Sequence, residues 1–370
     1  MNDFRWLKKS QDREDTVTNI LHNISYATQH IRTLFFIVVI ISSSVFFVPC
    51  PVLTEEQTTA EVIRRPNELG KIMVLMYHEV GPNESTWRRT PENLLKDLKK
   101  LYEDGYRPIS LRDFVNGNIT TPKGFTPVVL TFDDGTAGQF RFVENKNGEK
   151  SPDPKSAVGI LMDFHDQHPD FPAEATFFLH GTRPFEEKKT VTDKLRFLIA
   201  NGMDIGNHTA AHQNLGDRKY QNPAIIQRIV GSQAKFLTEQ IAGDFPEYSI
   251  DTLALCYGRR PKKSWLSRYL HKGRFENFEY RNIAVLNVGA GPAHSPFDER
   301  FRPLSLPRIR ASEKNTYGVG LYSWLKYFDM HPDERFVSDG DVKTVTLPKT
   351  VAHLNIDVIT ALGFGVVNAD

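Results

Sequence analysis

The 370-residue chain lacks the features that would point to a redox, nucleic-acid or nucleotide function. It has only two cysteines, Cys50 and Cys256, whose separation excludes a CxxC redox pair and a thiolate cage for zinc. Basic and acidic residues nearly cancel, 46 against 45, so no charge excess favours nucleic acid. No phosphate-binding loop or dinucleotide fingerprint is found. The 40% hydrophobic content is that of a folded globular protein.

One apolar segment near the N-terminus departs from this average. Residues 34–53 read LFFIVVIISSSVFFVPCPVL, and fourteen of these twenty are Leu, Ile, Phe or Val. Twenty helical residues span about 30 Å, the thickness of the hydrocarbon core of a bilayer. The polar leader before them carries five basic and four acidic residues, a weak positive-inside signal. We therefore predict one transmembrane helix that anchors an extracytoplasmic domain at the cell membrane.

Two alternatives to the anchor are a long signal peptide, which would make the protein secreted, and a buried core helix. The predicted domain plan is a cytoplasmic tail (1–32), a transmembrane anchor (33–53), a spacer (54–70), a barrel domain (71–346) and a C-terminal tail (347–370).

From residue 72 onward, short apolar runs alternate with helical patterns. Buried strands are predicted at 72–78, 128–132, 174–179, 203–207, 252–258 and 283–289. Helices are predicted at 91–105, 156–168, 190–202, 223–241 and near 263–270. This alternation is typical of an α/β fold with a parallel sheet, and about seven units suit a distorted (β/α) barrel. An open, doubly wound sheet is the competing fold, and in both the chemistry lies at the carboxyl ends of the strands.

Three predicted strands end in polar residues. Asp133 and Asp134 follow one strand, and His208 and His212 follow another as HxxxH. Two neutral imidazoles and one carboxylate hold a catalytic zinc ion and leave a coordination position open for water. The remaining carboxylate can take a proton, so the pattern indicates a hydrolase with a metal, a water and a base.

The motifs TFDDG (131–135) and IGNHTAAH (205–212) resemble those of the polysaccharide deacetylases of carbohydrate esterase family 4. MVLMYHEV (73–80) and ATFFLHG (175–181) are also similar to members of that family, and the resemblance spans residues 71–291. It implies a distorted (β/α) barrel that removes acetyl groups from polymeric sugars.

The resemblance also implies individual roles. Asp133 would be the general base, and Asp134, His208 and His212 would bind a divalent metal, Zn²⁺ first, with Co²⁺ or another divalent ion as alternatives. The main chain of Tyr257 would help to stabilise the oxyanion.

The chain departs from the family pattern at its third motif. Ala254 stands where the family has an arginine that pairs with the base, and Cys256 stands in place of a proline. Arg259 and Arg260 lie just downstream and are candidate replacements. The family's late histidine motif, which supplies the general acid, is not evident, and His294 after strand 283–289 is the substitute that we predict.

Two further histidines follow predicted strands. His78 and His180 each end an apolar run, and either a site or a structural role would explain them. Cys256 lacks an obvious base for nucleophilic catalysis, so a small buried residue is the simpler interpretation.

The leading prediction is a membrane-anchored, metal-dependent deacetylase whose partner is an acetylated cell-wall or extracellular polysaccharide, with no nucleic acid bound. The alternative is a non-catalytic glycan-binding or cell-wall maintenance protein that keeps the same fold. A metal-dependent amidase for another substrate class is a third option. The glycan, the metal and the oligomeric state are left open by the sequence.

Overall fold

The computed structural model describes residues 64–369. The predicted tail (1–32) and transmembrane anchor (33–53) lie outside these residues and stay predictions. Among the helices of residues 64–369, none has both the length and the apolar character that a membrane span requires.

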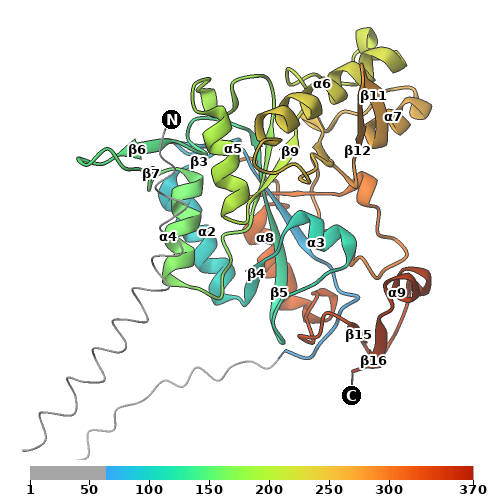
Figure 1. The fold of residues 1–370 in the computed structure, drawn as a ribbon. Coiled ribbons are helices and arrows are strands. Elements are labelled where there is room, and N and C mark those ends of the chain that lie inside the picture. Colours follow the sequence, from blue (N-terminus) through green and yellow to red (C-terminus); the bar gives the residue numbers. More distant parts are fainter. Residues whose placement is uncertain (1–63, 370) are drawn as a thin grey trace, which may run out of the picture. The chain divides into compact units, whose positions relative to one another are not determined.

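An eight-stranded sheet in which all neighbours are parallel forms the centre of the fold (Figure 1). Its strands are β1 (Met73–Tyr77), β4 (Tyr106–Pro108), β5 (Thr126–Asp134), β8 (Thr176–Leu179), β9 (Asp204–Asn207), β10 (Thr252–Ala254), β13 (Ala284–Leu286) and β14 (Ile309–Arg310). Seven of them follow the order β13-β10-β9-β8-β5-β1-β14, and β4 pairs with the start of β5. The predicted parallel α/β architecture is therefore confirmed.

The two ends of this strand order approach each other through one short segment. Leu306 bridges to Leu286 of β13, and Ile309 pairs with Leu75 of β1. The Leu306 N–H donates to the Val285 carbonyl over 3.0 Å. The strands thus curve into a distorted (β/α) barrel whose closing segment is residues 306–310.

The sheet is buried on both faces, which explains its continuous apolar strands. In β1, Met73 and Leu75 belong to the core beneath the helices, whereas Val74 belongs to a second core with Val129 and Phe178. Side chains alternate between the two cores because successive residues of a strand point to opposite faces. Asp133 has the same strand parity as Val129, so its side chain lies on the face of the second core.

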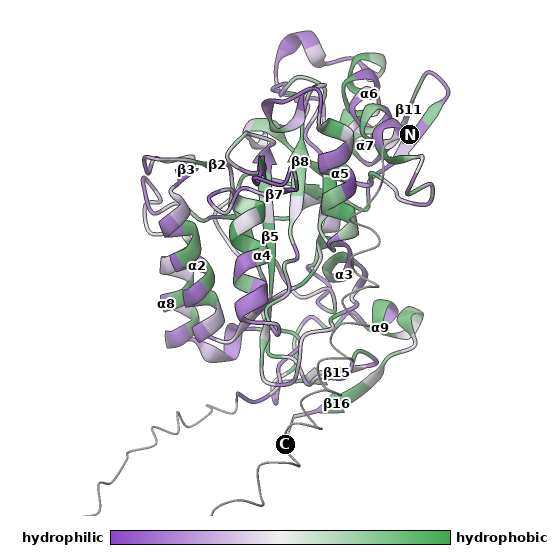
Figure 2. Cartoon of the chain, turned by 60° about the vertical axis from the view of Figure 1, so that its left-hand side comes forward, coloured by the Kyte–Doolittle hydropathy of each residue, from purple (hydrophilic) through white to green (hydrophobic). Residues whose placement is uncertain are grey.

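Helices pack outside the sheet, and their caps follow from the sequence. The helices are α2 (Pro91–Glu103), α3 (Leu111–Asn116), α4 (Ala157–Gln167), α5 (Val191–Ala200), α6 (Pro223–Ile241), α7 (Arg268–His271), α8 (Leu321–Met330) and α9 (Ile356–Leu362). The side chains of Thr90, Ser156 and Asn222 accept hydrogen bonds from the first turns of α2, α4 and α6. Figure 2 shows α2 and α4 with apolar residues on the side of the sheet and polar residues outside.

Within residues 64–369, four strand pairs lie outside the main sheet. They are β2 (Glu79–Val80) with β3 (Arg88–Arg89), β6 (Phe142–Glu144) with β7 (Lys150–Pro152), β11 (Lys272–Phe275) with β12 (Phe278–Arg281), and β15 (Thr344–Leu347) with β16 (Gly365–Asn368).

Some predicted elements are shorter than expected. The strand predicted at 252–258 ends at Ala254, because residues 256–258 form a 3-10 turn in which Tyr257 has a φ of 56°. The strand predicted at 283–289 is limited to Ala284–Leu286. The helix predicted near 263–270 is a 3-10 turn followed by α7, with only four residues.

The segments on either side of the predicted barrel domain contact each other. Asn67 pairs with Val337, and the N–H of Glu68 donates to the Thr346 carbonyl over 2.9 Å. Beyond residue 346, α9 and β16 return the chain to β15. The predicted limits at residues 71 and 346 stay predictions, and these contacts extend across both of them.

Candidate active site and metal centre

Three side chains from two strand ends converge at the carboxyl edge of the sheet. Asp134 is the last residue of β5, and His208 and His212 follow β9. The Asp134 Oδ1 lies 3.3 Å from the Nε2 of His208 and 3.2 Å from the Nε2 of His212. The three residues predicted to bind a metal are thus brought together.

Three residues of this site have unusual backbone angles, which set the directions of their side chains. Asp134 has a φ of 81°, Thr209 of 63° and His212 of 51°, in the left-handed region that non-glycine residues seldom adopt. Each such residue costs about 1 kcal/mol or more, and such costs concentrate at functional sites. Gly135, with a φ of 66°, continues the turn after Asp134 without that cost.

Two of the atoms that face each other, the His208 Nε2 and the Asp134 Oδ1, are acceptors without a donor within residues 64–369, and a cation between them would satisfy both. The Nδ1 of His208 lies 2.9 Å from the Ala254 carbonyl and can only donate to it, so its Nε2 carries a lone pair in the neutral ring. Neither this Nε2 nor the Asp134 Oδ1 has a hydrogen-bond partner among the described residues, although both are buried. Ligand atoms about 2.0–2.1 Å from a tetrahedral ion stand about 3.4 Å apart, close to the separations of this cluster.

The pKa values of the two histidines also favour a positive charge at this point. The Asp134 carboxylate, whose Oδ1 lies 3.2 Å from the His212 Nε2, is the main cause that raises the pKa of His212 to about 10. Burial opposes a charge on His208, but nearby Cys256, Asp133 and Asp134 outweigh it and raise its pKa above the usual range. The cluster therefore attracts a proton or a metal ion, and its donor set fits a divalent ion.

Cys256 adds a sulfur beside the two imidazoles. Ligand atoms of His208, His212 and Cys256 all lie within 4.8 Å of one another. The Cys256 Sγ also lies 3.3 Å from the His208 carbonyl and 3.3 Å from the Thr209 hydroxyl. The thiol thus ties the third strand end to the histidine loop, and it provides a possible alternative ligand to Asp134.

Asp133 is held by an arginine that the sequence analysis did not identify. The two Nη atoms of Arg308 lie 2.7 Å from the two carboxylate oxygens of Asp133, and both side chains are buried. Burial by itself would raise the pKa of Asp133, but Arg308 and the nearby imidazoles more than offset this and lower it. Asp133 is therefore an ionised, buried carboxylate.

Arg308 forms with Asp133 the pair that the family resemblance assigns to an arginine at the position of Ala254. It comes from the closing segment 306–310, which the sequence analysis did not recognise as a strand. Of the two candidates considered, Arg260 binds the Asn287 side chain and the Leu304 carbonyl, and Arg259 is exposed. No residue spacing pointed to Arg308, because its link to Asp133 depends on how the barrel closes.

Two histidines that end strands border the cluster. The His78 Nε2 lies 3.9 Å from the Asp133 Oδ2, and its ring packs on Trp87 with 4.7 Å between centroids. Burial is the main cause that lowers the pKa of His78. The His180 ring lies 5.5 Å from the His212 ring. Both residues therefore face the site rather than only closing the barrel.

Tyr257 lies at the mouth of the site. Its ring is 60% exposed and approaches the His212 ring edge-on at 4.7 Å. Its proposed role in stabilising an oxyanion through the main chain stays a prediction.

The structure does not bring His294 to the cluster. Ala293 pairs with Ile72, directly before β1, whereas His78 directly follows β1. Since a strand rises about 3.3 Å per residue, His294 lies about 20 Å from the cluster, at the opposite edge of the sheet. There it approaches Asp298, with 3.5 Å between Nδ1 and Oδ2. The prediction of His294 as the general acid is not supported by this placement, because the connection after β13 turns back toward the start of β1.

Comparison with known proteins points to one family. Residues 120–268 match the polysaccharide deacetylase family, a narrower span than the resemblance noted above, with β1 outside it. A deacetylase from Streptococcus pyogenes, PplD in complex with acetate, is 20% identical, with 65% of this chain and 92% of that chain covered and a TM-score of 0.45. BC0361, a polysaccharide deacetylase from Bacillus cereus, is 18% identical, with 70% and 68% covered and a TM-score of 0.48. IcaB from Ammonifex degensii is 17% identical, with 66% and 93% covered and a TM-score of 0.46. None of the curated proteins compared matches the chain.

Proposed function

We propose that the chain, whose residues 120–268 match the polysaccharide deacetylase family, is a metal-dependent enzyme that removes acetyl groups from a cell-wall or extracellular glycan. The family is one of hydrolases that act on acetyl amide or ester bonds of carbohydrates.

The observation that carries the proposal is the convergence of Asp134, His208 and His212 beside the Asp133–Arg308 pair. A divalent ion held by the first three residues would polarise the acetyl carbonyl and lower the pKa of a water molecule. Asp133 and Asp134 are adjacent, so a ligand and a base are supplied by one strand end.

Asp133 is the base in this proposal. Arg308 keeps its carboxylate ionised, and the buried pair leaves it little freedom to turn away. It accepts a proton from the attacking water as the new carbon–oxygen bond forms.

His78 is the group placed to return a proton. Its Nε2 lies near the Asp133 carboxylate, and its Nδ1 is a buried atom without a hydrogen-bond partner among residues 64–369. We propose that it takes over the proton that Asp133 accepts from the water and passes it to the leaving nitrogen or oxygen, so that acetate and a free amine or hydroxyl are released. It replaces His294 in the general-acid role.

Two exposed aromatic rings support a sugar polymer as the substrate. Trp87, 45% exposed, packs against His78, and Tyr257 packs against His212 on the other side of the cluster. Aromatic rings provide apolar platforms at low entropic cost, which suits the faces of sugar rings. We propose that neighbouring sugars lie on these rings while one acetyl group enters the site.

Location at a membrane is a further part of the proposal, and it rests on residues 33–53 alone. Extraction of the full chain from membranes by detergent but not by high salt would support an anchor, and a chain starting near Glu61 is the matched control. Recovery of the intact full chain in the soluble fraction would contradict it.

The non-catalytic alternative loses its main motive. It rested on the absence of an arginine at Ala254 and on the uncertain general acid, and Arg308 supplies the missing guanidinium from another segment. Glycan binding without turnover by the metal-loaded chain is the result that would favour this alternative.

Release of acetate from acetylated glycans tests the enzyme directly. The full chain is incubated with Zn²⁺ or Co²⁺ and with chitin oligomers, peptidoglycan or acetylated xylan in parallel. We expect release from at least one glycan, its loss with a chelator, and a decrease of at least about 100-fold in Asp133→Asn. Asp163→Asn, on the exposed face of α4, is the control that keeps activity. Equal activity in Asp133→Asn and Asp163→Asn would rule out the proposed base.

A further inference from the structure

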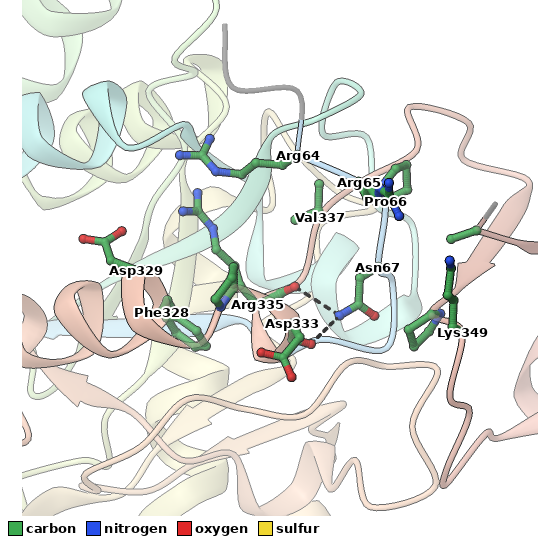
Figure 3. A pocket seen from close by; sticks show the side chains of 13 residues that line it. Arg64, Arg65, Pro66, Asn67, Phe328, Asp329, Asp333, Arg335, Val337 and Lys349 are labelled. Carbon is green, nitrogen blue, oxygen red and sulfur yellow. Dashed lines mark hydrogen bonds between the residues drawn. The ribbon is translucent and has the colours of Figure 1, made fainter.

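A cavity of about 510 Å³ lies at the edge of the sheet opposite to the candidate active site (Figure 3). Its position follows from Arg335, which lines it. Arg335 pairs with Lys71, before β1, and its Nε donates to the hydroxyl of Thr126, the first residue of β5. The cavity is therefore at the amino ends of the strands, about a strand length from Asp133 and Asp134.

Arg335 is a buried cation that forms no ion pair within residues 64–369, although the carboxylates of Asp104 and Asp329 lie near enough to act on it electrostatically. Its side chain is almost fully inaccessible, and it donates to two neutral acceptors, the Thr126 hydroxyl at 2.7 Å and the Asp104 carbonyl at 2.6 Å. Its guanidinium packs 3.9 Å from the Tyr106 ring centroid. Among the residues of the folded unit described here, no carboxylate comes within 4.0 Å of it. A buried guanidinium in this state favours the approach of an anion.

A second guanidinium converges on the same place. Both guanidinium groups lie close to Gly105. A Cβ atom built on this glycine would lie 2.5 Å from the Nη1 of Arg64 and 3.8 Å from the Nη2 of Arg335. Figure 3 shows these two guanidinium groups next to each other on one side of the cavity. Two like charges repel at this distance unless an anion lies between or beside them.

The charged residues that line the cavity carry a net positive charge. Arg65 and Lys349 add two cations, and Asp329 and Asp333 at the rim add two carboxylates, so the excess corresponds to Arg64 and Arg335. Apart from Asn67, the other walls are apolar and come from Phe328, Pro332, Val337, Pro348, Pro66 and Ala369. The volume exceeds that of a simple ion, and apolar walls suit an organic body attached to the charged group.

We propose that this cavity binds a phosphate group, either as the free ion or as a phosphate ester, with Arg64 and Arg335 as the binding pair. Phosphate offers three or four acceptor oxygens in a tetrahedron, enough for two guanidinium forks at once, whereas a carboxylate offers two. The site is separate from the deacetylase centre and its occupation does not depend on the metal.

Calorimetric titration of the full chain tests the proposal with two probes. Inorganic phosphate represents the free ion, and glycerol 1-phosphate represents an ester with a small organic body. We expect saturable binding of phosphate, and Arg64→Ala should weaken it at least about tenfold, since it removes charged hydrogen bonds. Arg281→Ala removes the same charge from β12 and should leave binding unchanged.

The two probes separate the sources of the phosphate. Tighter binding of glycerol 1-phosphate than of phosphate supports an ester as the ligand, and equal binding supports the free ion. The proposal is overturned if neither probe binds at millimolar concentration, or if Arg64→Ala and Arg281→Ala bind both probes equally. Arg335→Lys is a second variant that keeps the charge; a folded Arg335→Lys chain that binds phosphate as tightly as the unmodified chain would also contradict the paired-fork geometry.

Discussion

A buried carboxylate serves as a base near neutral pH only if something keeps it ionised, and Asp133 depends on Arg308 for this. The pair is fully buried and doubly hydrogen-bonded. In the proposed mechanism, the closing segment 306–310 therefore supplies the partner of the base as well as part of the barrel wall.

Replacing Arg308 should affect both stability and pH dependence. Arg308→Met leaves a buried, uncompensated carboxylate, and we expect a loss of about 3–5 kcal/mol in the free energy of unfolding. In the unmodified chain the pKa of Asp133 is lowered, so the base stays ionised well below neutral pH. Without Arg308, burial raises that pKa, so the acidic limb of the kcat/KM profile should move to higher pH.

Denaturant unfolding and pH–rate profiles measure the two effects. The double variant Asp133→Asn/Arg308→Met should regain part of the stability that Arg308→Met loses, since no charge is left buried alone. If the single variant unfolds like the unmodified chain and keeps its pH profile, then Arg308 does not control Asp133.

Trp87 should contribute to binding of polymers more than to the chemical step. Loss of one stacked sugar costs about 0.5–1.5 kcal/mol, which is about a two- to tenfold rise in KM. We expect this rise in Trp87→Ala for long acetylated oligomers, with kcat nearly unchanged and no rise for short ones. Trp265→Ala, a similarly exposed tryptophan that contacts Arg268, is the control. A fall in kcat with an unchanged KM would assign Trp87 to positioning His78 instead.

At the scale of elements, long periodic segments were predictable and short ones were not. Helix α6 begins and ends at the predicted residues because Asn222 caps it and apolar residues recur at helical spacing. The two-residue strand β14 has too few residues to show a period, so no pattern of residues predicts that Arg308 lies near Asp133.

The convergence of the proposed metal ligands was predictable for another reason. Asp134 ends β5 and His208 and His212 follow β9, both strands are apolar runs visible in the sequence, and parallel strands bring their carboxyl ends to one edge. His294 follows β13 along the chain, but the direction of an irregular connection cannot be read from residue types. Its placement at the amino edge depends on the pairing of Ala293 with Ile72.

Glu68, near the start of the described residues, should make the free energy of unfolding depend on pH. This buried carboxylate accepts hydrogen bonds from the N–H groups of Thr346 and Asp339, and burial is the main cause that raises its pKa from 4.5 to about 8. The folded chain thus binds this proton more tightly than the unfolded chain. Its contribution to stability is full below about pH 4.5 and is lost as the pH rises to about 8.

Melting temperatures between pH 5 and 8 check this prediction. Glu68→Gln cannot ionise, so its melting temperature should fall less over this range than that of the unmodified chain. Glu239→Gln, on the exposed face of α6, is the control and should keep the full dependence. Identical slopes for all three chains would show that Glu68 is not the group that titrates.

At the scale of the whole molecule, the two edges of the barrel have different charge requirements. The carboxyl edge collects acceptors that need a cation, and the amino edge collects guanidinium groups that need an anion. Each requirement joins segments that are distant in sequence: β5 with the loop after β9 at one edge, and Arg64 with Arg335 at the other. A ligand at either edge should therefore stabilise the complete fold rather than a single loop.

The metal allows this to be measured. A ligand that binds only the folded chain adds about 2.7 kcal/mol at a concentration of 100 times its Kd, so Zn²⁺ should raise the melting temperature by roughly 5 °C or more, and a chelator should reverse the shift. His212→Ala should abolish the shift, whereas His271→Ala in α7 should keep it. Cys256→Ser distinguishes the two donor sets: the shift persists if Asp134 completes the site and is lost if the thiol does. Equal shifts in His212→Ala and His271→Ala would mean that zinc binds elsewhere, and the cluster would then need another explanation for its two unpaired acceptors.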